Sequence, residues 1–279
     1  MRRSFLGRSW ANAVAVVLLV FFAFPVYWMA STAFKQNNDI ISKTPVFLPL
    51  NATFEHFSTA THAPQFWDMV RNSFVVTVTS VLASLVIATL ASFAVARMKF
   101  RGRKTFILVI MLAQMAPWEI MVISVYLIVR DNDMLNSLVP LVIFYMMMVL
   151  PFTIWTLRGF IAAVPKELEE SAMVDGCTRP QAFVKVVFPL LAPGLMSTSL
   201  FGFITAWNEF PLVLVLNKAT GPGTAQTLPL WLTSFQTTFG DDWGATMAAS
   251  TLFALPILIL FLFLQRKAVG GMTAGAVKG

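Results

Sequence analysis

Six long apolar runs constrain the fold of this chain more than any other feature. Each is long enough for a helix to cross about 30 Å of hydrocarbon, which takes roughly 20 apolar residues. Five runs contain no Asp, Glu, Lys, Arg or His, and the third contains only Glu119. They predict an all-α membrane protein with six transmembrane helices in a single domain over residues 1–279, because a β-barrel would show short alternating segments instead. The runs cover residues 11–33, 74–96, 106–129, 138–157, 186–206 and 244–264.

The distribution of basic residues predicts the orientation. Of the 20 Lys and Arg residues, 15 fall in segments 1–10, 97–105, 158–185 and 265–279. Basic residues in short loops stay on the cytoplasmic side, so we expect both termini and the loop 158–185 in the cytoplasm. The first apolar run exceeds the roughly 7–15 residues of a signal-peptide core, which predicts an uncleaved helix.

The segments between the runs are expected to be irregular, with short helices. Residues 34–73 should hold turns and a short amphipathic helix near residues 65–72. The short apolar pieces within 208–243 could pack against the bundle, lie at the membrane interface or contact an external partner, and packing is the expected role. Four prolines within the third, fourth and fifth runs interrupt these helices, and we expect kinks there. These prolines are Pro117, Pro151, Pro189 and Pro193.

The loop 158–185 carries unusually clear local signals for two helices joined by a turn. Pro165 and the acidic residues after it suit the first turn of a helix. Gly176 lies where a glycine commonly ends one. Thr178 to Gln181 then match a capping box, which begins a new helix. A helix, a glycine turn and a second helix leading into the fifth run are therefore predicted.

The same loop resembles the signature of the membrane subunits of binding-protein-dependent ABC importers. That signature is Glu-Ala-Ala, three residues, Gly, nine residues, then Ile-x-Leu-Pro, and Glu170, Ala172, Gly176 and Pro189 match it in register. Ser171 replaces the middle alanine. The resemblance extends to the branch of the maltose-transporter G subunit, a six-helix permease of carbohydrate importers. It is carried by Asn72-Ser73, Ala96-Arg97, Phe100-Arg101-Gly102, Pro151–Trp155, Leu157–Phe160, Trp207-Asn208-Glu209 and Thr273–Gly279.

This resemblance implies a type I ABC importer permease fold in a bacterial or archaeal cell membrane, and a set of partners. They would be a second permease subunit, two cytosolic ATP-binding subunits, an external solute-binding protein and the lipid bilayer, with no nucleic acid. The loop would be the coupling helix that contacts an ATPase. The coupling residues would be Glu169, Glu170, Ser171, Ala172, Asp175, Gly176 and Pro189.

The chain itself is not expected to be an enzyme. It contains no G-x-x-x-x-G-K-[ST] phosphate loop, and no nucleophile–base or metal-ligand cluster stands out. ATP hydrolysis is therefore expected in a separate subunit, and no cofactor or metal is expected here.

Three polar residues are candidates for the translocation path: Glu119, Asn208 and Glu209. A carboxylate within a transmembrane run faces a cavity or a partner, so Glu119 could line the path or be satisfied by neighbouring helices. Asn208 and Glu209 could contact solute or the external binding protein, or serve a structural role at the membrane interface. The tail 271–279 could enter the ATPase pair or be a disordered end.

A sugar or oligosaccharide is the expected solute, and a glycerol-phosphate-type solute or a polyol is the alternative. A self-sufficient secondary transporter would show an internal repeat or several intramembrane charges. A membrane enzyme would need a catalytic cluster. Neither pattern is evident in the sequence.

Overall fold

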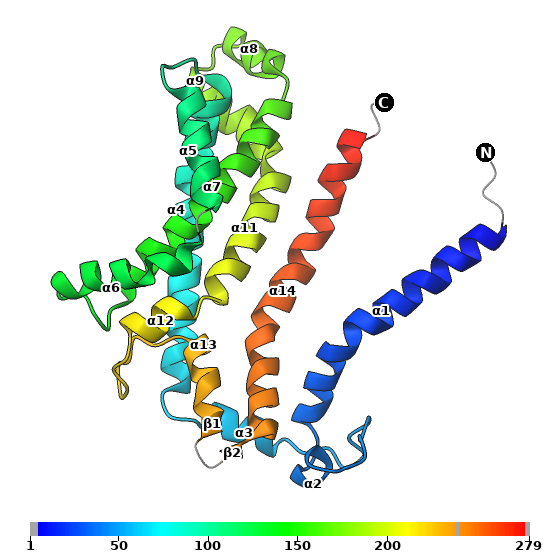
Figure 1. The fold of residues 1–279 in the computed structure, drawn as a ribbon. Coiled ribbons are helices and arrows are strands. Elements are labelled where there is room, and N and C mark those ends of the chain that lie inside the picture. Colours follow the sequence, from blue (N-terminus) through cyan, green and yellow to red (C-terminus); the bar gives the residue numbers. More distant parts are fainter. Residues whose placement is uncertain (1–4, 116, 238–239, 277–279) are drawn as a thin grey trace. The chain divides into compact units, whose positions relative to one another are not determined.

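The computed structural model describes residues 5–115, 117–237 and 240–276, and helices make up most of this part of the chain (Figure 1). The first elements are α1 (Phe5–Ala33), α2 (Asn37–Ile40), α3 (Glu55–Thr61), α4 (Phe66–Arg97), α5 (Arg103–Met115), the 3₁₀ helix η1 (Trp118–Met121), α6 (Val122–Asp131) and α7 (Leu138–Ala163). They are followed by α8 (Lys166–Val174), α9 (Arg179–Ala182), the π-helix η2 (Phe183–Val187), α10 (Phe188–Leu190), α11 (Ala192–Trp207) and α12 (Pro211–Leu216). The last are α13 (Leu228–Trp231), the 3₁₀ helix η3 (Leu232–Phe235), the strands β1 (Gln236–Thr237) and β2 (Gly240–Asp241), and α14 (Trp243–Ala276).

Five stretches of helix among the described residues are long and apolar enough to cross a membrane. A sixth crossing is present if the bent pair formed by residues 103–115 and 118–131 counts as one span. The five stretches are Trp10–Ala33, Phe66–Arg97, Leu138–Ala163, Ala192–Leu216 and Trp243–Gln265.

The third apolar run, expected over residues 106–129, is interrupted at Pro117, where a kink is expected. The chain bends by 85° between α5 and η1. Pro117 lies at this bend, with extended backbone angles of φ −68° and ψ 110°. Proline has no N–H to donate and its ring disfavours the preceding helical turn, which contributes to the break here. Three other helices, α1, α7 and α14, do continue through internal prolines, at Pro25, Pro151 and Pro256.

Two other expected boundaries also differ. The short helix expected near residues 65–72 is the first part of α4, which begins at Phe66. The fifth run is interrupted near its start, because η2 and α10 precede α11. Pro189 explains this interruption: it cannot donate to the carbonyl of Lys185, and the Phe188 N–H donates to Phe183 across a widened π turn.

The described chain divides into two compact units. One contains residues 1–66 and 231–255, and the other contains residues 67–230 and 256–279. The organisation as a single domain therefore stays a prediction, and each unit is described by itself.

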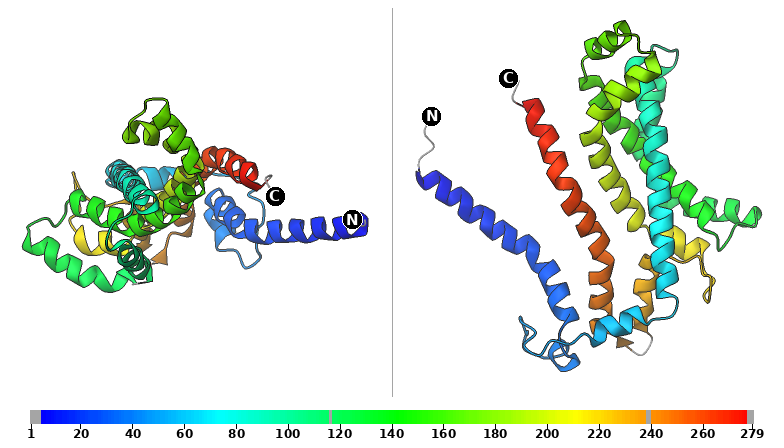
Figure 2. Two further views of the ribbon diagram at one scale, coloured as in Figure 1. Left: turned by 90° about the horizontal axis from the view of Figure 1, so that it is seen from above. Right: turned by 180° about the vertical axis from the view of Figure 1, so that it is seen from behind.

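The larger unit is built on α4, α7 and α11, which run side by side (Figures 1 and 2). Two glycines of α11 allow close contact with α7. A Cβ on Gly194 would lie 2.7 Å from the Phe160 ring, and one on Gly202 would lie 2.8 Å from Val149. Small residues at such positions let membrane helices approach closely. A buried apolar cluster around Val76, Leu141 and Leu216 completes the packing toward α12.

In the same unit, two side chains near the start of α4 bind the segment 224–228, which leads into α13. The amide of Asn72 donates to the carbonyl oxygens of Thr224 at 2.7 Å and Gln226 at 2.9 Å. The hydroxyl of Ser73 accepts from the Leu228 N–H at 2.8 Å. Buried backbone groups need such partners, so these two side chains fix a segment that has no regular structure of its own.

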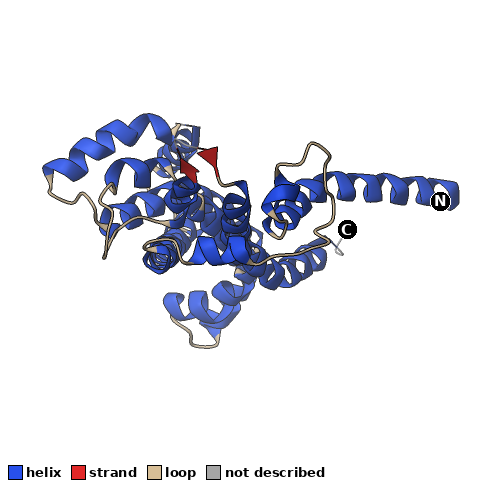
Figure 3. Ribbon diagram, turned by 90° about the horizontal axis from the view of Figure 1, so that it is seen from below, coloured by secondary structure: helices blue, strands red, loops and turns tan. Residues whose placement is uncertain are grey.

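The smaller unit contains α1, α2, α3, the first part of α14 and the paired strands β1 and β2 (Figure 3). Its Lys35 is buried, donates to the hydroxyl of Thr32 and lies 3.7 Å above the Trp28 ring. Burial lowers the pKa of Lys35, and the charge of Asp39 opposes this shift. The carbonyl of Lys35 lies 2.9 Å from the buried His56 ring, which anchors α3 to the end of α1.

Candidate functional site

The loop between α7 and α11 forms the helix, turn and second helix that its sequence predicts. Pro165 precedes α8 and takes the N-cap position, and Glu167 and Glu169 lie in the first turn. Acidic side chains there interact favourably with the positive end of the helix dipole. The local sequence is therefore sufficient to begin a short helix at this point.

Gly176 ends α8 in a Schellman motif. The Gly176 N–H donates to Met173 at 3.1 Å, and the Cys177 N–H donates to Ala172 at 2.9 Å. These are the two bonds that define the motif. Gly176 has a φ of +92°, a left-handed conformation that costs other residues about 1–2 kcal/mol. The glycine is thus required by the backbone of the turn.

A capping box begins the second helix, as expected. The side chain of Gln181 accepts from the Thr178 N–H at 2.8 Å, and the reciprocal contact is also present. Helix α9 then leads through η2 and α10 into α11. Pro189 has an exposed side chain within α10. The loop consequently consists of α8, ended by the Gly176 turn, and a helical stretch from α9 into α11 that begins at the capping box.

An ion pair ties the loop to the end of α4. Arg97 Nε donates to the Glu169 carboxylate at 2.5 Å, and Arg97 Nη2 donates to the Val164 carbonyl at 2.7 Å. The two charged side chains are only 9% and 14% exposed. Screening by water is weak for such a pair. Arg97 therefore fixes the position of α8 relative to α4.

One side of α8 and the turn after it are exposed. Glu170 and Ser171 are exposed, and so are Asp175 and Gly176 at the turn, whereas Ala172 is half-buried. Val174 is 87% exposed. A single exposed apolar side chain is common on protein surfaces and does not by itself mark a contact surface. The sequence reasoning did not select Val174, because exposure cannot be read from the residue type alone.

The three candidate path residues lie in different environments. Glu119 is exposed in η1 at the bend of the third run, and Asn208 is exposed at the end of α11. The carboxylate of Glu209 is buried, accepting from the Tyr145 hydroxyl at 2.6 Å and from the Leu212 N–H at 2.8 Å. Glu209 therefore joins α7 to the first turn of α12.

Within the residues that the structure describes, no group of His, Cys, Asp and Glu side chains could hold a metal ion. The arrangement offers instead a rigid, exposed tip at one end of a bundle of apolar helices (Figure 1). Such an arrangement is that of a membrane protein built on several apolar helices.

Comparison with known proteins identifies the class and then the family. Residues 80–272 match the model of the binding-protein-dependent transport system inner membrane component. The chain is 71% identical over 279 residues, all of both chains, to the diacetylchitobiose uptake system permease protein DasC of Streptomyces coelicolor. It is 30% identical to the trehalose/maltose transport system permease protein MalG of Thermococcus litoralis, again over the full length of both. The chain belongs to the family of binding-protein-dependent transport system inner membrane components, and it is an ABC importer permease of a bacterial membrane.

A solved structure supports the same fold. The chain is similar to a chain in the crystal structure of a bacterial ABC transporter involved in the import of the acidic polysaccharide alginate. The TM-score is 0.77 at 22% identity, covering 95% of this chain and 99% of that one. The all-α ABC importer permease fold predicted from the sequence is therefore confirmed.

Proposed function

We propose that this chain forms half of the pathway of an ATP-driven sugar importer, with a second permease subunit, two cytosolic ATPase subunits and an external solute-binding protein. Both termini and the loop 158–185 lie in the cytoplasm. Helix α8 and the Gly176 turn contact one ATPase and transmit its movement to α11. The chain itself performs no catalysis.

The shape of the loop is the observation that carries this proposal. Glu169 is held within the chain by Arg97, whereas the neighbouring Glu170 and the tip residue Val174 face outward. Helical segments joined by a hydrogen-bonded turn resist bending better than an irregular linker. A displacement of α8 would therefore be transmitted to the start of α11.

The proposed solute is diacetylchitobiose or a related oligosaccharide of N-acetylglucosamine. The support is the 71% identity, over both full lengths, to a permease named for diacetylchitobiose uptake. A glycosylated glycerol is the second candidate. The sulfoquinovosyl glycerol permease SmoH of Agrobacterium fabrum is 32% identical over 275 residues.

Two exposed residues, Glu119 and Asn208, remain our candidates for the wall of the path. Their carboxylate and amide could bond the hydroxyl and acetamido groups of such a solute. Glu209 serves instead to position α12 against α7.

Uptake by proteoliposomes tests the proposal. The complex would be reconstituted with its binding protein, with ATP enclosed in the lumen, and supplied with labelled diacetylchitobiose. We expect uptake that needs both ATP and the ATPase subunits, and competition by unlabelled diacetylchitobiose but not by maltose. Uptake without ATP would contradict the ATP-driven mechanism. If maltose competed for uptake and unlabelled diacetylchitobiose did not, only the proposed identity of the solute would be contradicted.

A further inference from the structure

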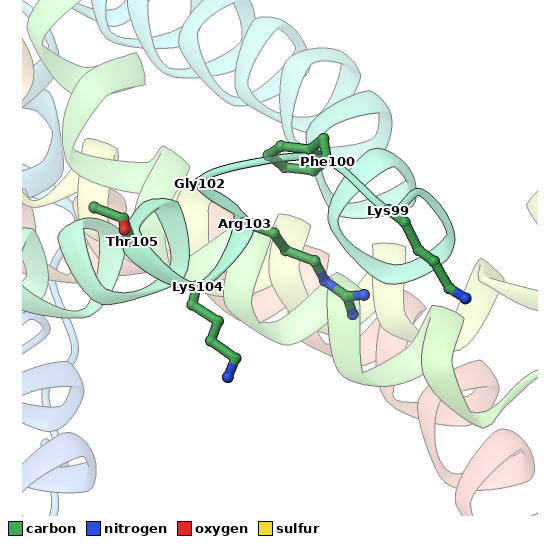
Figure 4. A pocket seen from close by; sticks show the side chains of 6 residues that line it. All are labelled: Lys99, Phe100, Gly102, Arg103, Lys104 and Thr105. Atoms are coloured by element: carbon green, nitrogen blue, oxygen red, sulfur yellow. The ribbon is translucent and has the colours of Figure 1, made fainter.

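We infer that the basic loop between α4 and α5 binds the phosphodiester headgroup of an anionic phospholipid. The loop encloses an open hollow of about 400 Å³ (Figure 4). The hollow is lined by Lys99, Phe100, Gly102, Arg103, Lys104 and Thr105. Three of these six residues are cationic, Thr105 adds a hydroxyl donor, and there is no carboxylate.

The cations of this loop are not neutralised within the described part of the chain. Arg97 pairs with Glu169, but no ion pair is recorded there for Lys99, Arg101, Arg103 or Lys104. Four positive charges within six residues repel one another. An anion placed among them would relieve this repulsion as well as form charge-assisted hydrogen bonds. The positive charge of this cluster therefore favours the binding of an anionic ligand.

The backbone brings these side chains to one place. Gly102 has a φ of +89°, and the Phe106 N–H donates to its carbonyl at 2.8 Å. The chain reverses there between the end of α4 and the start of α5. Figure 4 shows the side chains of Lys99 and Arg103 extending on the same side of the ribbon, with Lys104 next to them. Residues from the two helix ends thereby share one hollow.

The neighbouring apolar surface favours a lipid over a soluble anion or an acidic protein. Phe100 and Phe106 are 44% and 40% exposed, and Leu108 and Leu112 farther along α5 are each 55% exposed. Exposed apolar side chains on a membrane helix can contact acyl chains, because they need an apolar environment. A lipid whose chains lie along α5 would have its phosphate at the level of the basic loop, as basic residues beside membrane helices commonly place it. A single phospholipid could then contact both the basic loop and the apolar surface of α5.

Native mass spectrometry of the purified importer complex tests this site. The complex would be offered equal amounts of phosphatidylglycerol and phosphatidylcholine, and the bound adducts of each would be counted. We expect the wild type to prefer phosphatidylglycerol, and K99Q/K104Q to bind it about thirtyfold more weakly. K99R/K104R, which keeps both charges, should bind it like the wild type.

The matched control is K43Q/K218Q, which removes two exposed lysines far from this loop in the sequence. It should leave the phosphatidylglycerol adducts unchanged. Unaltered binding by K99Q/K104Q would overturn the proposal, and so would an equal loss in the control. Displacement of the lipid by millimolar inorganic phosphate would show a free-anion site instead. If K99Q/K104Q lost the ATPase subunits but kept the lipid, the loop would be a protein interface and the proposal would be overturned.

Discussion

Glu209 illustrates at the residue scale how a charged side chain can be held inside a membrane bundle. Its two carboxylate oxygens each have a donor, the Tyr145 hydroxyl and the Leu212 N–H. A buried polar group left without its partner costs about 1–3 kcal/mol. The side chain therefore stabilises the contact between α7 and α12 only as long as both donors are present.

The effect of replacing Glu209 on stability should consequently depend on whether the new side chain can form hydrogen bonds. We expect Glu209→Gln to leave the thermal stability of the purified complex nearly unchanged, since an amide can still accept from Leu212 and bond to Tyr145. Glu209→Ala should reduce the free energy of unfolding by about 1–3 kcal/mol. Thermal unfolding of the two variants measures this difference. Equal stability of the alanine variant would show that the contact is not formed.

At the scale of an element, α8 depends on an ion pair with α4. Breaking a largely buried pair by removing one partner leaves an uncompensated charge. We expect Glu169→Ala to loosen α8, seen as hydrogen exchange at α8 amides at least tenfold faster than in the wild type. Glu170→Ala is the matched control, because Glu170 is exposed. It should leave exchange unchanged while weakening the association with the ATPase. Slow exchange at α8 in Glu169→Ala would contradict the bracing role of Arg97.

The packing of α11 on α7 permits a comparable test with two glycines. A Cβ on Gly202 would lie 2.8 Å from Val149, whereas a Cβ on Gly159 of α7 would meet nothing within 4 Å. Gly202→Ala should lower the free energy of unfolding by about 1–3 kcal/mol through overpacking. Gly159→Ala should have no such cost and could stabilise the helix. Thermal unfolding measures the stability of both variants. A Gly202→Ala variant as stable as the wild type would mean that the close contact between α7 and α11 does not contribute to stability.

The sequence predicted the parts of these elements that depend on neighbouring residues. The glycine turn at Gly176 and the capping box at Thr178 follow from local hydrogen bonds, which is why their positions were predicted correctly. The Arg97–Glu169 and Tyr145–Glu209 contacts join residues 72 and 64 positions apart. No periodicity or cap encodes such distant pairs. Pro117 indicated a kink, but the 85° angle depends on packing that the sequence does not reveal.

At the scale of the whole molecule, the orientation in the membrane can be tested with a native residue. Cys177 is the one cysteine in the sequence, and it follows Gly176 in the proposed cytoplasmic turn with a partly exposed side chain. A membrane-impermeant maleimide should therefore label it in inverted vesicles and not in intact cells. Bound ATPase subunits should slow the labelling. Rapid labelling of intact cells would place the loop outside and reverse the proposed topology.

The central claim is that the Gly176 turn couples ATP turnover to sugar movement. Its most direct test is the number of sugar molecules imported per ATP hydrolysed by proteoliposomes that carry wild type, Gly176→Asn or Gly176→Val. Asparagine tolerates left-handed backbone far better than the β-branched valine. We predict that the asparagine variant keeps much of the wild-type ratio and that the valine variant loses at least tenfold, with membrane insertion intact in both. An unchanged ratio in Gly176→Val would contradict the account.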